Sequence, residues 1–187
     1  MRQWRRARKP GCGVPAPTLE NMSIATFHLP DAAATAAAGA RLAPELRGGM
    51  VITLCGDLGT GKTTLVRGAL RALGWAGAVK SPTYALVEHY QFSSLYFYHF
   101  DFYRLADPSE WETAGLTDYF RADAVCLIEW PERVAGLLPP PDLALTLAHP
   151  SAATADGREI TLDARTKAGE RCLVAMTSTN ARAVRGA

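Results

Sequence analysis

Two continuous apolar runs mark the centre of the predicted fold. "MVITLC", Met50 to Cys55, and "AVCLIEW", Ala124 to Trp130, carry no charge over the length of a strand, apart from one acid near the end of the second run. Such runs are typical of strands that are covered on both faces, as in the parallel part of an α/β sheet. The pattern therefore predicts a sheet core built around these two segments.

Shorter apolar segments predict the rest of the sheet. "SIATFHL", Ser23 to Leu29, alternates polar and apolar residues as a half-buried strand does. "YALVEHY" and "LYFYHFDFY" flank the turn-like residues Gln91 to Ser94, and "LALTLA" and "REITLDA" are expected to form a closing antiparallel pair. "RCLVAM", residues 171–176, is the candidate for one further strand.

Helix signals separate these strands. Asp31 is a predicted N-cap before an Ala-rich run, and a second helix is expected from Lys62 to about Leu73, ended by Gly74. "DPSEWETAGL" predicts another helix, with Asp107 as N-cap and Pro108 at its first position. "ERVAGLL" predicts a short one. The alternation of strands and helices indicates the α/β class, with a sheet flanked by helices.

The chain divides into three parts by composition. Residues 1–21 are basic and then rich in Pro and Gly, which predicts a flexible head; Met22 directly after it is an alternative start. Residues 22–165 hold the strand and helix signals and form the predicted domain. Residues 166–187 are expected to form a C-terminal strand or a frayed tail.

Charge and cysteine content narrow the class of protein. The 187 residues carry a net charge of +2, but five of the 20 basic residues lie in the head, so the body is close to neutral. A broad nucleic-acid footprint, and DNA binding with it, is therefore not expected. No apolar run approaches the roughly 20 residues that span a membrane. The four cysteines form no C-x-x-C pair, which favours reduced thiols and a cytoplasmic location.

"CGDLGTGKTTLVRGAL", Cys55 to Leu70, matches the phosphate-binding pattern G-x-x-x-x-G-K-[ST] between a predicted strand and a predicted helix. Its glycines let backbone N–H groups turn toward phosphate oxygens, and the helix N-terminus faces the same place. Lys62 can reach the β- and γ-phosphates, and the Thr63 hydroxyl can bind Mg²⁺. The predicted nucleotide-binding residues here are Gly56, Asp57, Leu58, Gly59, Thr60, Gly61, Lys62, Thr63 and Thr64.

A Mg²⁺-dependent phosphate loop also needs a carboxylate from a nearby strand. Asp101 in "YHFDFYRL" and Glu129 in "LIEW" both lie near strand ends, where ligands collect in parallel sheets. Which of the two holds the metal and which orients water is left open. His99 shares a strand face with Asp101 and is more typical of a core or hydrogen-bonding residue. Arg104 could neutralise phosphate charge or form an ion pair with a nearby acid.

Two further motifs are missing from the sequence. It has no N-K-x-D motif for reading guanine, and the segment after the loop helix has no Arg-rich cluster like the lid of a small-molecule kinase. The residues therefore favour ATP hydrolysis over transfer of phosphate to a metabolite.

Four ordered blocks resemble the TsaE (formerly YjeE) family of bacterial P-loop ATPases. The blocks are "GDLGTGKTT" (Gly56 to Thr64), "VKSPTYALVEHY" (Val79 to Tyr90), "YHFDFYRLADPSE" (Tyr98 to Glu110) and "LIEWPERV" (Leu127 to Val134). The resemblance spans about residues 23–165. It implies a P-loop NTPase-like three-layer fold with a mixed, mainly parallel sheet. It also implies a Mg²⁺-dependent ATPase that acts on the TsaD–TsaB heterodimer, which forms N6-threonylcarbamoyladenosine at position 37 of ANN-decoding tRNAs.

The resemblance also implies roles for single residues. Lys62, Asp101 and Glu129 are the expected catalytic residues. Thr63, Glu129 and Asp101 are the expected metal ligands, and Thr83 of the "SPT" segment is expected to close over the γ-phosphate. ATP and Mg²⁺ are the expected cofactors, and tRNA is contacted only through the partner complex. Two other interpretations remain: a binding module that ATP only switches, and a small-molecule kinase related through the loop alone.

Overall fold

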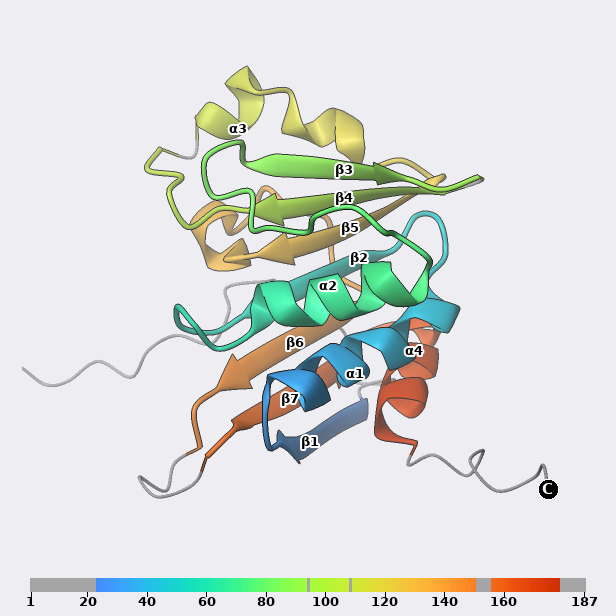
Figure 1. The fold of residues 1–187 in the computed structure, drawn as a ribbon. Coiled ribbons are helices and arrows are strands. Elements are labelled where there is room, and N and C mark those ends of the chain that lie inside the picture. The colour runs from blue at the N-terminus through green and yellow to red at the C-terminus, as the bar shows by residue number, and fades with distance from the viewer. Residues whose placement is uncertain (1–22, 94, 108, 151–155, 179–187) are drawn as a thin grey trace, which may run out of the picture.

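The computed structural model describes residues 23–93, 95–107, 109–150 and 156–178 (Figure 1). A seven-stranded mixed sheet runs through the molecule in the order β1-β7-β6-β2-β5-β4-β3. Its strands are β1 (Ser23–Leu29), β2 (Val51–Cys55), β3 (Val87–Gln91), β4 (Tyr96–Asp101), β5 (Ala124–Glu129), β6 (Leu143–Ala148) and β7 (Arg158–Ala164).

The centre of the sheet is parallel and its edges are antiparallel. β6, β2, β5 and β4 pair in parallel, whereas β3 joins β4, and β7 and β1 follow β6, in antiparallel pairs. Every residue of β2 and β5 is buried, as their continuous apolar sequences predict. The antiparallel pairing of "LALTLA" with "REITLDA" is confirmed, with Leu143 opposite Ala164.

Helices cover both faces of the sheet, which confirms the three-layer fold. On one face, α1 (Ala32–Leu42), α2 (Lys62–Ala72) and α4 (Lys167–Thr177) enclose the larger apolar core. On the other face, α3 (Glu110–Thr113) and the 3₁₀ turns Leu116–Tyr119 and Pro131–Val134 cover a smaller core over β4 and β5. Aromatic rings are prominent in this smaller core, where Phe102 lies 5.7 Å from Trp111 between ring centroids.

Two glycines bring α1 and α2 unusually close together. A Cβ atom on Gly39 would lie 2.0 Å from the carbonyl oxygen of Leu65, and one on Gly68 would lie 2.0 Å from that of Ala36. Only glycine allows such an approach of two backbones. Asp31 begins α1 as predicted, because its carboxylate accepts a hydrogen bond of 2.7 Å from the Ala34 N–H group. α2, which begins at Lys62, therefore packs backbone to backbone against α1.

The structure corrects two details of the sequence-based interpretation. "RCLVAM" is not a strand but part of α4, which Thr166 caps by accepting a hydrogen bond from the Gly169 N–H group. The buried residues Gly169, Cys172 and Met176 follow a helical spacing that the short apolar run concealed. The helix predicted at Asp107 is shorter than expected and begins at Glu110, although Asp107 makes the contacts of a cap: its carboxylate accepts a hydrogen bond of 2.9 Å from the Ser109 N–H group, and its own N–H donates one of 3.2 Å to Glu110 Oε1.

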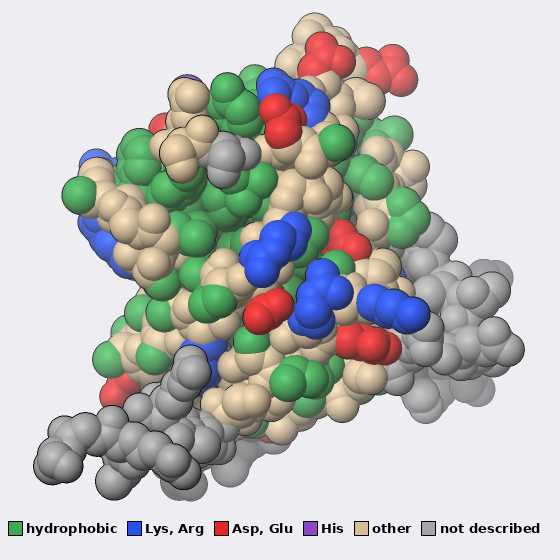
Figure 2. Space-filling model, turned by 90° about the vertical axis from the view of Figure 1, so that its right-hand side faces the viewer, with side chains coloured by type: hydrophobic (Ala, Val, Ile, Leu, Met, Phe, Trp, Pro, Cys, Tyr) green, Lys and Arg blue, Asp and Glu red, His purple; other side chains and the backbone are tan. Residues whose placement is uncertain are grey.

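Several sequence-based expectations fall outside the described residues. These are the flexible head at 1–21, the alternative start at Met22, Pro108 and the end of the tail at 179–187. None of the described helices combines the length and apolar character needed to cross a membrane. On the face shown in Figure 2, Lys and Arg side chains lie among Asp and Glu side chains, so the described residues form no broad basic patch on that face.

Candidate functional site

The phosphate loop (residues 56–61) connects β2 to α2. Gly56, Gly59 and Gly61 have φ angles of 136°, 79° and 103°, in the range that side chains disfavour. Gly61 directly precedes α2 and provides no side-chain cap. The N–H groups of the first turn of α2 are therefore available to an anion at the positive end of the helix dipole.

Lys62 is buried at the base of this loop. Its ammonium donates hydrogen bonds to the carbonyl oxygens of Gly56 (2.7 Å) and Asp57 (3.0 Å) and lies 4.2 Å from the ring centroid of Trp130. Burial lowers the pKa of Lys62 below its usual value, and the negative charge of nearby Glu129 partly opposes the shift. The charged form of Lys62 is therefore stabilised by any further negative charge placed beside it.

The two strand-end acids lie next to each other. Asp101 is paired with Glu129 where β4 runs parallel to β5, and each is only 3% exposed. Glu129 Oε1 accepts a hydrogen bond of 2.7 Å from the Thr63 hydroxyl and lies 2.9 Å from His99 Nε2. The Thr63 bond connects α2 to β5, so that the loop and the acid form one site.

Asp101 is bound to the segment that contains "SPT". The hydroxyls of Ser81 and Thr83 both donate to Asp101 Oδ2, the Thr83 bond being 3.2 Å long, and the two hydroxyls are 2.7 Å apart. Asp101 Oδ1 accepts a hydrogen bond of 2.9 Å from the Tyr103 N–H group. Glu129 therefore contacts the phosphate loop helix, while Asp101 contacts the hydroxyl segment, Ser81 to Thr83.

A cavity of about 240 Å³ lies between these groups. The predicted residues that line it are Leu58, Gly59, Gly61, Lys62, Thr63, Thr64, Thr83, Asp101 and Glu129. The carbonyl oxygens of Gly56 and Asp57 accept the hydrogen bonds from Lys62. Thr60 is buried, and its hydroxyl donates to the carbonyl oxygen of Asp57. The structure thus brings together predicted residues from four separate parts of the chain.

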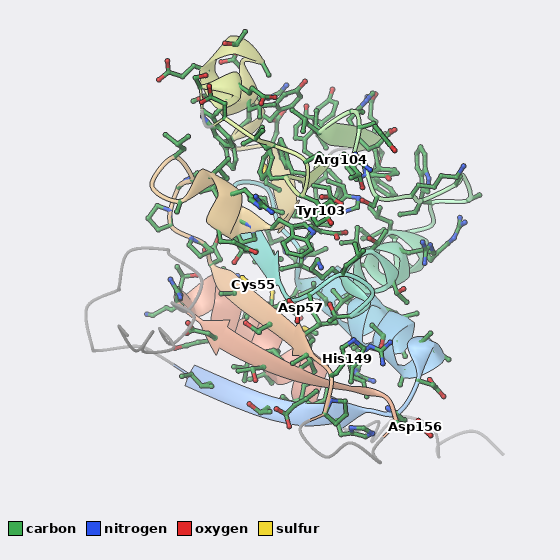
Figure 3. All side chains as sticks on the ribbon, turned by 90° about the vertical axis from the view of Figure 1, so that its left-hand side faces the viewer. Cys55, Asp57, Tyr103, Arg104, His149 and Asp156 are labelled. Atoms are coloured by element: carbon green, nitrogen blue, oxygen red, sulfur yellow. The ribbon has the colours of Figure 1, made fainter. Side chains whose placement is uncertain are left out.

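A second cavity, of about 230 Å³, adjoins the other side of the phosphate loop. It shares Gly59, Gly61 and Thr64 with the first cavity, and Asp31 and Arg158 are among its other lining residues. Arg158 also donates a hydrogen bond of 3.3 Å to the carbonyl oxygen of Gly59. In Figure 3, Cys55 and Asp57 lie between Tyr103 and Arg104 on one side and His149 and Asp156 on the other.

Several lining residues, Tyr103, Trp130 and Arg158 among them, were not predicted as part of the site. Tyr103 and Trp130, whose rings lie 5.0 Å apart, line the first cavity, and Arg158 lines the second. Tyr103 follows Asp101 by two residues and Trp130 directly follows Glu129, so their place in the sequence could have predicted a position at the site. No local sequence pattern predicts such a position for Arg158. The guanidinium of Arg104, for which the sequence allows two roles, lies 4.5 Å from the ring centroid of the exposed Tyr84.

Comparisons with known proteins give the family. The model of a family described as threonylcarbamoyl adenosine biosynthesis protein TsaE matches residues 29–160. The tRNA threonylcarbamoyladenosine biosynthesis protein TsaE of Haemophilus influenzae is 46% identical over 129 residues, which are 69% of this chain and 79% of that protein. The protein of the same name from Bacillus subtilis is 41% identical over 116 residues, 62% of this chain and 70% of that protein.

A solved structure shows the same fold. The crystal structure of Bacillus subtilis YdiB superimposes with a TM-score of 0.70 and 28% sequence identity, covering 85% of this chain and 97% of that one. The family match covers the phosphate loop, the hydroxyl segment and both strand-end acids. With the site and the fold in agreement over most of its length, this chain belongs to the TsaE family.

Proposed function

We propose that this protein is a Mg²⁺-dependent ATPase that acts in the biosynthesis of threonylcarbamoyladenosine in tRNA. The names of the matching relatives support the pathway. The observation that carries the chemistry is the 2.7 Å hydrogen bond from the Thr63 hydroxyl to Glu129 at the wall of the first cavity. Phosphate-loop NTPases use such a hydroxyl and a strand-end carboxylate at the metal that accompanies the nucleotide.

The phosphate loop and α2 hold the triphosphate in this proposal. Uncapped N–H groups at the start of α2 donate to phosphate oxygens, and Lys62 exchanges its two carbonyl partners for them. Because burial destabilises the charged ammonium, the negative charge of the phosphates relieves an existing electrostatic cost. The second cavity, on the other side of the loop, provides the space for the nucleoside.

The donor set fits Mg²⁺. Within the described residues, no three His, Cys, Asp or Glu side chains cluster into a metal site of their own. The Thr63 hydroxyl and Glu129 would hold the ion, and the remaining ligands would be phosphate oxygens and water, as is usual for Mg²⁺. When bound, the ion supplies neutralisation of the charge on the phosphate oxygens.

Asp101 has a different role because it has different partners. It accepts hydrogen bonds from Ser81 and Thr83, whereas Glu129 accepts one from Thr63 of the phosphate loop helix. We assign to Asp101 the orientation of the attacking water, and to Thr83 the contact with the γ-phosphate. Such a site accelerates hydrolysis by positioning and electrostatics, without a covalent intermediate.

The site is also suited to activation by a partner. Among the described residues, Lys62 is the only basic side chain in the wall of the first cavity. Hydrolysis by this chain alone is therefore slow, and a partner supplies the further positive charge that stabilises the transition state. We propose that this partner is the TsaD–TsaB complex, that tRNA is contacted only through it, and that the modified base is adenosine 37 of ANN-decoding tRNAs.

The cytoplasm is the proposed location, consistent with the buried free thiols of Cys126 and Cys172.

Reconstitution tests this proposal. The full chain is assayed for ATP hydrolysis alone and with TsaD, TsaB and an ANN-decoding tRNA, and modified adenosine is counted over several turnovers. We expect stimulation by the partners and repeated turnover only when the chain is present. Glu129→Gln is expected to lower hydrolysis by about 10²- to 10³-fold, since it removes the charge that holds the metal.

Glu132→Gln is the matched control, because Glu132 is an exposed acid three residues away and should leave hydrolysis within about two-fold. Equal hydrolysis with and without the partners would contradict the activation, and full activity of Glu129→Gln would remove this acid from the mechanism. If Glu129→Gln binds ATP, does not hydrolyse it and still supports modification at the normal rate, ATP acts only as a switch for binding.

A further inference from the structure

His99 is a buried titratable residue to which the proposed mechanism gives no role. It lies on β4, has no exposed surface, and faces the same side of the sheet as Asp101 two residues later. Its Nε2 atom is 2.9 Å from Glu129 Oε1. Its Nδ1 atom is buried and has no hydrogen-bond partner among the described residues.

These contacts determine which nitrogen carries the proton. A proton on Nε2 makes His99 the donor to the Glu129 carboxylate and leaves Nδ1 as an unpaired acceptor. A proton on Nδ1 would instead bury an unpaired donor and set the Nε2 lone pair against a carboxylate oxygen. A proton on Nε2 satisfies the contact that the structure contains, so His99 is a hydrogen-bond donor to Glu129.

The geometry then defines how Glu129 is held. Thr63 from α2 and His99 from β4 both contact the same oxygen, Oε1. Within the described part of the chain no hydrogen bond reaches the other oxygen, Oε2, while Glu129 itself lines the cavity. Two donors from two different elements thus fix the rotation of the carboxylate and leave Oε2 for a ligand in the cavity.

We propose that His99 is a positioning residue that orients Glu129 for the metal ion that accompanies the nucleotide. The assignment rests on the proposed function, because it presumes Mg²⁺ at Glu129. Outer-shell partners of this kind orient a metal ligand, and their removal typically costs about 10- to 100-fold in metal affinity or activity. A purely structural histidine would be a poor choice here, because its unpaired Nδ1 makes it less favourable than an apolar residue of similar size.

Three substitutions separate the positioning role from packing. Gln places an amide nitrogen at the same number of bonds from Cα as Nε2, so His99→Gln keeps the donor to Glu129. Asn places its nitrogen at the position of Nδ1, so His99→Asn loses that donor but remains polar. His99→Leu removes all donors while filling the space. Thr53→Val is the control, because Thr53 is a fully buried polar residue on β2, on the other side of β5 from His99, and its hydroxyl has no partner in the described structure.

The measurement is the gain in nucleotide affinity that Mg²⁺ provides. ATP affinity of the full chain is determined by calorimetry in Mg²⁺ and again in EDTA, and the ratio of the two is compared between variants. We expect His99→Leu and His99→Asn to lower this ratio by about 10-fold or more, with the affinity in EDTA nearly unchanged. His99→Gln and Thr53→Val are expected to keep the ratio of the unmodified chain. A structural role would instead change both affinities together.

The outcomes distinguish this proposal from the proposed function. If Mg²⁺ increases the affinity of the unmodified chain and of His99→Leu or His99→Asn equally, the positioning role is refuted and the proposed function stands. If His99→Gln loses the gain as fully as His99→Leu, the donor at Nε2 is not what matters and the proposal also fails. If the unmodified chain gains nothing from Mg²⁺, both proposals fail. Should His99→Leu not fold, His99→Asn and His99→Gln carry the same comparison.

Discussion

Replacing Gly56 by Ala should destabilise the protein far more than the same change at Gly59 in the same loop. Gly56 has a φ of 136°, and a Cβ atom there would lie 2.2 Å from the carbonyl oxygen of Leu147 on β6. Gly59 also has a positive φ, 79°, but a Cβ atom there meets nothing within 4 Å. The pair therefore separates the cost of backbone conformation from the cost of a steric clash.

The expected magnitudes follow from these two terms. A non-glycine residue in a left-handed conformation costs about 1–2 kcal/mol, which is the whole effect expected for Gly59→Ala. Gly56→Ala adds the displacement of a central strand, and overpacking of this kind costs about 1–3 kcal/mol more. The free energy of unfolding should therefore fall by about 2–5 kcal/mol for Gly56→Ala.

Denaturant unfolding of the nucleotide-free protein measures both variants against the unmodified chain. For a domain of this size each kcal/mol also lowers Tm by about 2–4 °C, so thermal unfolding provides a second estimate. Equal losses for the two variants would refute the reasoning, because they would mean that the approach of Gly56 to β6 contributes nothing.

Two further predictions concern Lys62 and the ring beside it. Because burial lowers the pKa of Lys62 below 10.5, ATP affinity should fall as pH rises from neutral toward that value, with proton uptake on binding that calorimetry in different buffers detects. Without nucleotide, the contribution of Lys62 to the unfolding free energy should rise with pH between its lowered pKa and 10.5, since the unfolded chain then binds more protons. Lys62→Met should lack both effects, and a flat affinity in the unmodified chain would contradict the lowered pKa. ATP should also change tryptophan fluorescence, because it draws the Lys62 ammonium from its place 4.2 Å from the Trp130 ring centroid. Trp130→Phe should abolish this change and Trp75→Phe should keep it; equal loss in both would contradict the contact.

Much of the fold was predictable because it depends on local patterns. The uninterrupted apolar runs of β2 and β5 indicated strands covered on both faces, and the structure buries every residue of both. Asp31 was recognisable as a cap because a cap acts within one turn of its helix. α4 was missed because a short apolar run has no clear period, and its burial at Gly169, Cys172 and Met176 becomes helical only through packing on the sheet.

The candidate site divides in the same way. Lys62 and Thr63 follow the glycines directly, so their place at the start of a helix is written in consecutive residues. The contacts of Asp101 and Glu129 are different, because they depend on which strand pairs with which and in what register. Only the parallel pairing of β4 with β5 puts the two acids side by side and brings His99 to Glu129.

The sequence by itself thus determined the phosphate loop, the two strand-end acids and the α/β class. The tertiary structure alone decided that Glu129 contacts the loop through Thr63, that Asp101 contacts Ser81 and Thr83, and that Arg158 reaches the loop from β7. The physical reason is the range of the interactions. Turns, caps and apolar periodicity act between near neighbours, whereas these hydrogen bonds join residues from 18 to 99 positions apart, which only the order and register of the strands bring together.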